Sequence, residues 1–318
     1  MNYRGWDMLA ACLDALETTG DKEERPGVIV VDNHSADGRL ASFAARYPWV
    51  HFLESPVNEG FARGNNRGAA VAAGRYLLFL NPDTVISREA LAALLEESRR
   101  HDPLQILSLR QVSPAGREEH TDRLFPSFWT VNSLVRSLYK ALSSAGKDMR
   151  CHESGMVRPD WVSGSVVWIP RDAFERLGGW DRDYWLYYED VDLCRRLRDR
   201  GGEVLLLCDP PVIHRHGGTT RKDKKRVAFF KTYVLISQHI YFRKHFPGWR
   251  GHLMLAFLVL NNLFFDQLFP ALAGLLLFPF GTLRRYLIIY IYLVKYYLRA
   301  LALRRWNPDP EELPFGKK

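Results

Sequence analysis

The sequence predicts an α/β protein in which helices cover a largely parallel sheet. Short apolar runs at 28–31 and 76–80 have the length and composition of buried strands. Amphipathic segments that read as helices alternate with these runs. Polar residues, Asn81 and Asp83 among them, follow the second run directly, at the end of a strand where open α/β sheets bind their ligands.

The first predicted helix covers residues 7–16, because Leu9, Cys12, Leu13 and Leu16 share one face. The next elements follow in chain order: a strand at 28–31, a helix near 41–47, a short strand near 51–53, a helix over 61–73, a strand at 76–80 and a helix over 88–100. We expect residues 111–156 to be irregular, with an apolar patch around 125–138.

The most informative segment is an aromatic cluster that leads into two adjacent acids. Trp185 and Tyr188 precede Glu189 and Asp190, which open an amphipathic helix. Acids in a first turn suit the positive end of the helix dipole, so helix capping is one interpretation. A carboxylate beside aromatic rings can instead serve as a general base in a cleft. The two acids lie about 100° apart around the helix, so only one of them can face a ligand.

Two further segments predict a cation site at the edge of the sheet. Asp83 follows Asn81 and the rigid Pro82 at the end of a strand, where its carboxylate can bind a hard divalent cation. The alternative is an ordinary Asn-Pro-Asp turn. A second apolar run, at 212–213, ends in His214. We expect His214 at the same edge of the sheet as Asp83.

Six motifs occur in a recognisable order and spacing. They are the segments 30–38, 58–68, 81–83 and 161–165, the aromatic run into Glu189 and Asp190, and the pattern His214-x-x-Gly217-x-Thr219. Together they resemble the inverting family 2 glycosyltransferases with the GT-A fold. The resemblance is strongest to the rhamnosyltransferase-like branch, which acts on lipid-linked or polysaccharide acceptors, and it covers residues 2–245.

The resemblance implies a Rossmann-like GT-A domain over residues 1–245 that binds a nucleotide-diphosphate sugar, with thymidine- or uridine-type nucleoside. The implied donor-binding residues are Asp32, Asn33, Ser35, Asn58, Gly60, Arg63, Asn66, Asn81 and Asp83. For Asp32, a structural role in an Asx turn is the alternative. Mg²⁺ or Mn²⁺ would be held by Asp83 and His214, while His216 should matter little.

The resemblance also assigns the reacting groups. Asp190 would take the proton from an acceptor hydroxyl, with Glu189 as the alternative base. The implied acceptor or sugar pocket comprises Trp161, Gly164, Ser165, Trp185 and Tyr188, and the irregular insertion would line the acceptor cleft.

Cysteine usage and the N-terminus bear on the compartment. The four cysteines, Cys12, Cys151, Cys194 and Cys208, show no paired metal-ligand spacing. We therefore expect neither a zinc site nor a disulfide scaffold, and a reducing cytoplasmic compartment. The chain opens without a cationic stretch followed by an apolar one, so no signal peptide is predicted.

The C-terminal part, 246–318, reads as a membrane-associated helical tail. Asp266 is the only formal charge between residues 251 and 283, while six Lys or Arg and no acid occupy 284–305. Basic residues beside an apolar stretch suit an anionic, cytoplasmic membrane surface, with the tail lying on the bilayer or spanning it. A buried helical subdomain is the alternative. We do not expect nucleic-acid binding, because the aromatics alternate with aliphatics rather than with basic residues.

One departure from the family pattern concerns the N-terminus. Family members begin with a hydrophobic strand that ends in a Tyr-Asn or Asn-Tyr turn, whereas here Asn2 follows Met1 directly. We expect this central strand to be missing and the true start to lie upstream. Three other functions stay open: a transferase with a soluble acceptor, a nucleotidyltransferase, or an inactive nucleotide-sugar-binding protein.

Overall fold

The structure, a computed structural model, describes residues 1–18, 26–100, 104–119, 124–132, 135, 137–138, 151, 155–215, 224–276 and 281–308. The chain forms two compact units. The first comprises Met1–Phe125, Ala145–Arg182 and Glu189–Gly217, and the second comprises Pro126–Ser144, Asp183–Tyr188 and Gly218–Lys318. The division that we predicted at 245–246 stays a prediction. In the structure, α9 (Lys224–His245) is grouped with the C-terminal helices.

The first unit is an α/β domain whose early elements match the predicted ones within about two residues. They are α1 (Trp6–Glu17), β1 (Val28–Asp32), α2 (Arg39–Arg46), β2 (Val50–Glu54), α3 (Gly60–Val71), β3 (Tyr76–Leu80) and α4 (Arg88–Arg100). Later elements were not predicted or only in part. They are β4 (Thr84–Val85), β5 (Gln105–Val112), β6 (Glu118–Glu119), β7 (Met156–Val157), β8 (Val166–Pro170), α7 (Arg171–Arg176) and β9 (Glu203–His214).

The main sheet is mixed rather than mostly parallel. Its strands follow the order β3-β8-β5-β9-β4. In addition, β6 pairs with β5, and β7 pairs with β9. β5 and β9 are parallel, but β8 lies antiparallel between β3 and β5. The fold class itself, a sheet flanked by helices, is confirmed.

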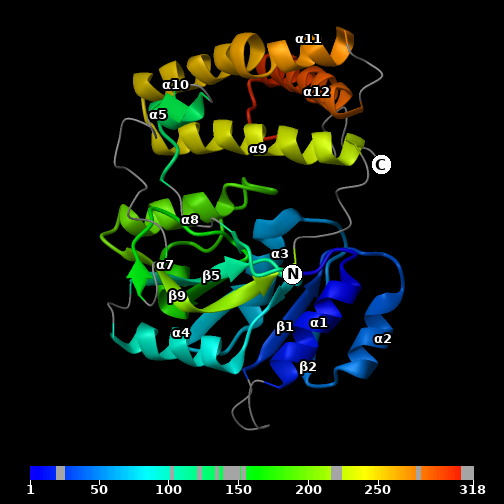
Figure 1. Cartoon of the computed structure of the whole chain (residues 1–318), viewed down its shortest axis with the longest axis vertical. Helices are drawn as coiled ribbons and strands as arrows, with labels where there is room; N and C mark the ends of the chain where they lie inside the picture. The colour runs from blue at the N-terminus through cyan, green and yellow to red at the C-terminus, as the bar shows by residue number, and fades with distance from the viewer. Residues whose placement is uncertain are drawn as a thin grey trace. The chain divides into compact units, whose positions relative to one another are not determined.

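The two faces of the sheet are covered by different helices (Figure 1). One face of the main sheet packs against α1 and α4, while α2 packs on β2, and these helices share a core that includes Trp6, Leu13, Phe43 and Leu94. On the other face, Phe61 of α3 and Phe79 of β3 both pack edge-on against Trp180. Because both faces are covered, strands such as β8 are apolar on both sides, and no residue of Val166–Pro170 is exposed.

The sheet is interrupted beside β1, where the missing strand was expected. β1 pairs in parallel with β2, and these two strands form a separate sheet. On its other side, β1 is bridged by a single residue among those described, Asn2. The amide of Asn2 donates to the carbonyl of Val31 at 2.8 Å, and the amide of Asn33 donates to the carbonyl of Asn2 at 2.8 Å. Asn2 therefore satisfies the carbonyl of Val31 and the amide of Asn33 on the side of β1 that faces away from β2.

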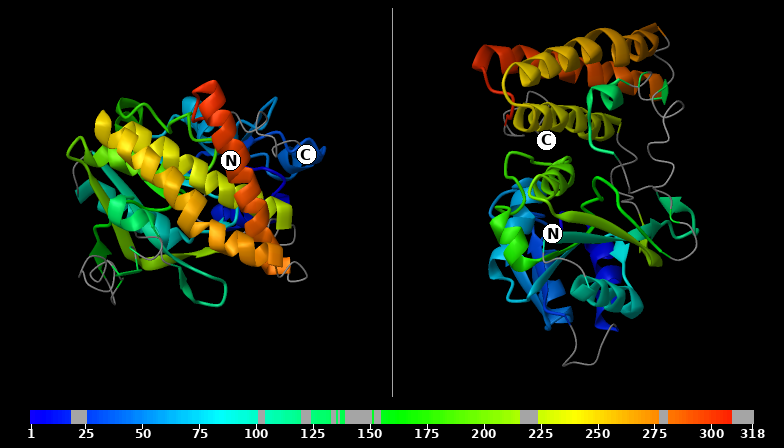
Figure 2. Two further views of the ribbon diagram at one scale, coloured as in Figure 1. Left: turned by 90° about the horizontal axis from the view of Figure 1, so that it is seen from above. Right: turned by 90° about the vertical axis from the view of Figure 1, so that its left-hand side faces the viewer.

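The second unit is a helical bundle. It contains α5 (Phe128–Val131), α9, α10 (Trp249–Leu260), a π-helical turn at Asn261–Asp266, α11 (Leu268–Leu276) and α12 (Gly281–Leu303). Within this unit α9 lies against α10 and α12, and α11 lies against α12, as both views of Figure 2 show. Trp249–Leu276 and Arg284–Leu303 are long and apolar enough to cross a membrane, by length and composition alone.

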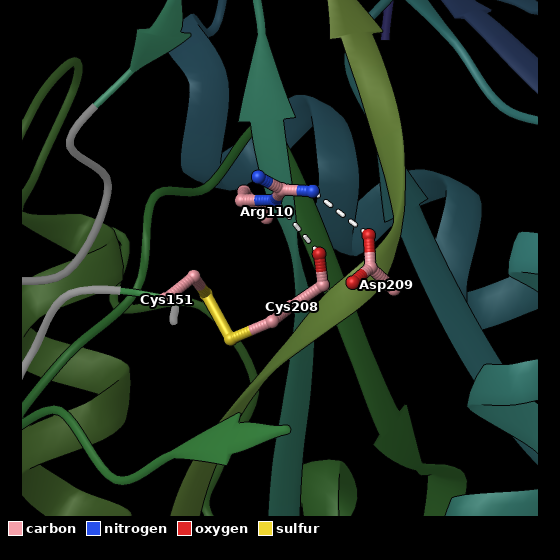
Figure 3. Close-up of a disulfide and its surroundings, with 4 residues drawn as sticks. All are labelled: Arg110, Cys151, Cys208 and Asp209. Carbon is pink, nitrogen blue, oxygen red and sulfur yellow. Dashed lines mark hydrogen bonds and ion pairs between the residues drawn. A yellow bond between two sulfur atoms is a disulfide. The ribbon is translucent and has the colours of Figure 1, made fainter. Parts of the chain in front are cut away.

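The described residues include one disulfide, which the expectation of a reducing compartment did not foresee. Cys151 and Cys208, 57 residues apart in the sequence, form a disulfide (Figure 3). Cys208 lies on β9, and the Arg110 side chain donates to its carbonyl at 2.7 Å and to Asp209 at 2.8 Å. Pairing across so long a separation leaves no local spacing pattern, which is why the sequence did not reveal it. Cys12 and Cys194 are free and buried.

We predict that reduction of this disulfide destabilises the first unit. Closing a long loop typically contributes about 2–4 kcal/mol, which corresponds to roughly 5–10 °C in Tm for a protein of this size. Thermal melts of the wild type with and without reductant should show that difference. The Cys151→Ala variant should melt at the reduced temperature under both conditions. Equal melting of the wild type with and without reductant would contradict the prediction.

Candidate active site

Asp83 and His214 lie together at the edge of the main sheet, as the sequence predicted. Thr84 of β4 pairs with His214, the last residue of β9, and the amide of Arg215 donates to the carbonyl of Asp83 at 2.8 Å. This pairing brings Asp83 Oδ1 within 3.3 Å of His214 Nε2. Two adjacent ligands of an octahedral divalent ion are separated by about 3 Å, so this oxygen–nitrogen pair fits such an ion.

Glu119 is a neighbour of His214 that the sequence analysis missed. Its Oε2 lies 3.2 Å from His214 Nδ1, on the opposite side of the ring from Asp83. Burial alone would lower the pKa of His214, but the carboxylates of Asp83 and Glu119 together raise that pKa above its usual value. Glu119 comes from β6, in a segment that we expected to be irregular, so no periodic pattern singled it out.

The turn before β8 connects the two parts of the candidate site. The amide of Asn81 donates to the carbonyl of Ser165 at 2.9 Å, and Gln111 Nε2 donates to Ser165 Oγ at 2.6 Å. One residue earlier, the amide of Gly164 donates to Asp190 Oδ2 at 2.9 Å. A Cβ atom at Gly164 would lie 3.3 Å from the Phe61 ring and 3.5 Å from Asp190 Cβ, which explains the glycine at this close approach.

Glu189 and Asp190 occupy different environments at the start of α8 (Glu189–Arg198). Glu189 is only 4% exposed. Burial, reinforced by the charge of Asp190, raises the pKa of Glu189 well above its usual value. Asp190 is half-buried, and its Oδ1 accepts the amide of Val191 at 2.8 Å. Of the two acids, Asp190 is therefore the one that solvent and small molecules can reach.

The aromatic residues before these acids belong to the second unit. There Trp185 packs on Tyr233 and Phe229 of α9, with ring centroids 4.9 and 5.9 Å apart, and Tyr188 packs on Tyr241 at 5.7 Å. Tyr187 and Tyr188 both have positive φ angles, 69° and 67°. This left-handed conformation is uncommon for residues other than glycine and costs about 1–2 kcal/mol per residue. The role of Trp185 and Tyr188 in a sugar pocket stays a prediction.

The predicted donor residues after β1 form one hydrogen-bonded cluster. Asp32 Oδ2 accepts the amide of Ser35 at 3.2 Å, and the Ser35 hydroxyl donates to Asp32 Oδ1. The side chain of Asn33 donates to Asn58 Oδ1 at 2.9 Å and to the carbonyl of Gly60 at 3.1 Å. Asp32 thus accepts the amide three residues on, not two residues on as in an Asx turn, and the side chain of Asn33 links the end of β1 to the start of α3.

The remaining predicted residues make other local contacts. Asn66 donates to the carbonyl of Trp180 at 2.7 Å and accepts its amide at 2.9 Å, which ties α3 to that loop. Arg63 is exposed and reaches the carbonyl of Arg182 at 3.3 Å. The indole of Trp161 donates to the carbonyl of Leu124 at 3.1 Å. His216, Gly217 and Thr219 lie outside the described residues.

The fold and this edge of the sheet define a glycosyltransferase of the GT-A class. The chain belongs to glycosyl transferase family 2, whose family model matches residues 1–160.

The chain is similar to two proteins that are named as rhamnosyltransferases. It is 29% identical to N-acetylglucosaminyl-diphospho-decaprenol L-rhamnosyltransferase of Mycobacterium tuberculosis over 72% of this chain and 79% of that protein. It is 27% identical to rhamnosyltransferase WbbL of Escherichia coli K12, over 57% of this chain and 70% of that one. The resemblance to rhamnosyltransferases that the motifs suggested is therefore confirmed.

Solved structures show the same fold. The mannosyltransferase PcManGT of Pyrobaculum calidifontis, in complex with GDP-Man and Mn²⁺, aligns over 96% of this chain and 84% of that chain, with a TM-score of 0.50 and 18% identity. GalNAc-T7 with UDP, GalNAc and Mn²⁺ aligns with a TM-score of 0.52 and 15% identity. That alignment covers 74% of this chain and about half, 48%, of GalNAc-T7.

We predict that Glu189→Gln stabilises the protein increasingly as pH rises. The unfolded chain releases the proton of Glu189 near its ordinary pKa, whereas the folded protein retains it to higher pH. The wild type therefore loses stability as pH increases through that window, and the variant does not. The difference in Tm, variant minus wild type, should grow between pH 5 and pH 8, by about 2–4 °C for each kcal/mol. A difference independent of pH would show that Glu189 is not held in its protonated form.

Proposed function

We propose that this chain is an inverting glycosyltransferase of cell-envelope glycan synthesis. It transfers a sugar, rhamnose being the first candidate, from a nucleotide-diphosphate sugar to a hydroxyl of a lipid-linked or polysaccharide acceptor. The observation that carries the proposal is the pair Asp83 and His214, 3.3 Å apart at the sheet edge of a family 2 chain. The names of the two rhamnosyltransferase relatives support the sugar, and the decaprenyl-linked acceptor in one of those names supports the acceptor class.

Asp83 and His214 would hold Mg²⁺ or Mn²⁺. When bound, the ion would stabilise the negative charge that develops on the departing diphosphate. Among the described residues, no group of three or more His, Cys, Asp or Glu side chains is arranged to hold a metal ion. Two protein ligands leave coordination positions open for diphosphate oxygens and water, as Mg²⁺ prefers. The Mn²⁺ present in the structures of PcManGT and GalNAc-T7 supports this assignment.

Asp190 would act as the general base. Its carboxylate takes the proton from the acceptor hydroxyl as that oxygen attacks the anomeric carbon. The bond between this carbon and the diphosphate oxygen breaks on the opposite side, and the nucleoside diphosphate leaves with the bonding electrons, so the configuration inverts. The two backbone amides that hold Asp190, those of Gly164 and Val191, fix its carboxylate in one orientation.

The donor would bind along the polar edge formed by the residues after β1 and β3. The Asp32, Asn33 and Asn58 cluster supports the loop that would face the nucleotide. Asn81 and Asp83 are held beside Ser165 and His214. Arg63, exposed on α3, is available as a cation for a phosphate. Trp161, Gly164 and Ser165 of the first unit would line the sugar side of the site.

The second unit would attach the enzyme to the cytoplasmic face of the membrane. It exposes large apolar side chains that a soluble bundle would bury, including Phe265 at 62%, Phe269 at 65% and Leu276 at 81%. In the most apolar 18-residue stretch of Trp249–Leu276, only 22% is buried. Trp249, 69% exposed, and Arg250 begin this segment, and Arg284 begins the next. Aromatic and basic residues beside an apolar face are typical of helices at an anionic lipid surface.

The direct test of the function is a transfer assay with the purified full chain. Nucleoside diphosphate should be released from dTDP-rhamnose only when a polyprenyl-diphosphate sugar acceptor is added. The release should require Mg²⁺ or Mn²⁺ and stop with a chelator. If no donor in a panel of thymidine- and uridine-diphosphate sugars supports transfer to such an acceptor, the proposed function is wrong.

We predict that Asp190→Asn lowers turnover by roughly 100-fold or more while the affinity for the donor stays within about twofold, because asparagine keeps the shape but cannot accept the proton. Glu189→Gln, which stays buried beside it, should retain most of the turnover. Steady-state rates and donor titrations of both variants provide the comparison. An inactive Glu189→Gln beside an active Asp190→Asn would reverse the assignment of the base.

We predict that the full chain binds vesicles containing anionic phosphatidylglycerol, and that Phe265→Ser with Phe269→Ser weakens this binding roughly tenfold or more, because two exposed rings no longer enter the lipid. Cosedimentation measures the effect. The matched control is Val57→Ser with Val71→Ser, two exposed apolar residues of the first unit, which should leave binding unchanged. Equal losses in both double variants would show that the second unit is not the membrane contact.

A further inference from the structure

A carboxylate oxygen lies close to each ring nitrogen of the His214 imidazole. Asp83 Oδ1 lies 3.3 Å from Nε2, and Glu119 Oε2 lies 3.2 Å from Nδ1. The three side chains are largely withdrawn from solvent, with exposures of 9% for His214, 17% for Asp83 and 16% for Glu119. Since water competes weakly for these groups, the ring orientation is determined mainly by the two carboxylates.

We propose that Glu119 is a positioning residue for the metal site: it holds the Nδ1–H of His214 and thereby presents the unprotonated Nε2 to the cation. This inference rests on the proposed function, because it takes His214 as a ligand beside Asp83. Nothing in the resemblance or among the relatives' names assigns a role to Glu119.

The geometry makes Glu119 a partner of the ligand rather than a ligand itself. The two nitrogens of an imidazole point away from each other, so a carboxylate at Nδ1 cannot reach an ion bound at Nε2. A carboxylate that accepts the second N–H of a ligating histidine fixes which nitrogen carries the proton and makes the other nitrogen a better donor to the metal. Asp83 alone would favour the opposite tautomer, with the proton on Nε2.

The backbone holds Glu119 in this place. β6 pairs with the end of β5, where Glu119 lies opposite Gln111. Gln111 is also paired with Val212 of β9, two residues before His214, and its side chain donates to Ser165 Oγ at 2.6 Å. The short strand that carries Glu119 is therefore connected through β5 both to the strand of His214 and to the turn beside Asn81.

The experiment measures Mn²⁺ binding to the full chain by electron paramagnetic resonance, with and without UDP. Glu119→Ala should weaken Mn²⁺ binding by roughly 10- to 100-fold, the usual cost of losing such a partner. Glu119→Gln should recover part of the loss, because its amide oxygen can still accept Nδ1–H. The matched control is Glu118→Ala, the exposed neighbour on the same strand, which should bind Mn²⁺ like the wild type. Unchanged folding of each variant is verified by its thermal melt.

A second measurement distinguishes positioning from a merely structural role. In the metal-free protein with ¹⁵N-labelled histidine, at a pH where the ring is neutral, His214 should carry its proton on Nδ1. Its signals are assigned by comparison with His214→Gln. In Glu119→Ala the proton should shift toward Nε2, and in Glu118→Ala it should not. An unchanged tautomer in Glu119→Ala would overturn the inference, even if that variant were less stable.

The variant Asp83→Ala separates this inference from the function on which it rests. If Asp83→Ala binds Mn²⁺ as tightly as the wild type, the proposed metal site is wrong, and the role of Glu119 is wrong with it. If Asp83→Ala and His214→Gln lose Mn²⁺ binding but Glu119→Ala retains wild-type affinity, the metal site stands and the positioning role is wrong. Loss in all three, with partial recovery in Glu119→Gln, supports the inference.

Discussion

The candidate site depends on one short turn, Ser163–Ser165, which enters the antiparallel strand β8. On one side its Ser165 carbonyl accepts the amide of Asn81 and its Ser165 hydroxyl accepts the side chain of Gln111. On the other side, the amide of Gly164 holds the carboxylate of Asp190. Since β8 lies between β3 and β5, the turn that enters it is held beside Asn81 and Gln111 on one side and beside Asp190 on the other.

The sequence predicted best the helices and strands whose structure is determined by residues close together in the chain. The bounds of the strand that ends at Leu80 and of the helix Arg88–Arg100 were predicted to within one residue. In both segments the spacing of the apolar residues and the turn residues at the ends indicate the same element. Asp83 and His214 were correctly expected together, because each ends an apolar run. Glu119, the Cys151–Cys208 disulfide and the antiparallel direction of β8 depend on partners far away in the chain, and no local pattern records such partners.

Several residues that the family resemblance assigns to the donor or the reaction also carry structural hydrogen bonds. Asp32 accepts the amide of Ser35, Asn66 links α3 to Trp180, and Asp190 accepts two backbone amides. The structural and functional interpretations that the sequence left open are therefore compatible rather than exclusive. Removing such a side chain leaves buried amides without their acceptors, so a loss of activity by itself does not identify a reacting group. Isosteric changes that keep the hydrogen bonds separate the two effects.

The left-handed tyrosines before α8 have a consequence for how this segment can vary. Tyr187 and Tyr188 both adopt φ angles that glycine would occupy without steric cost. A chain under selection for stability alone would drift toward glycine or asparagine at these two positions. The ring of Tyr188 packs on Tyr241 within its own unit, a contact that glycine would lose. Sequence libraries at these positions should therefore tolerate asparagine and glycine in folding screens, and β-branched residues least of all.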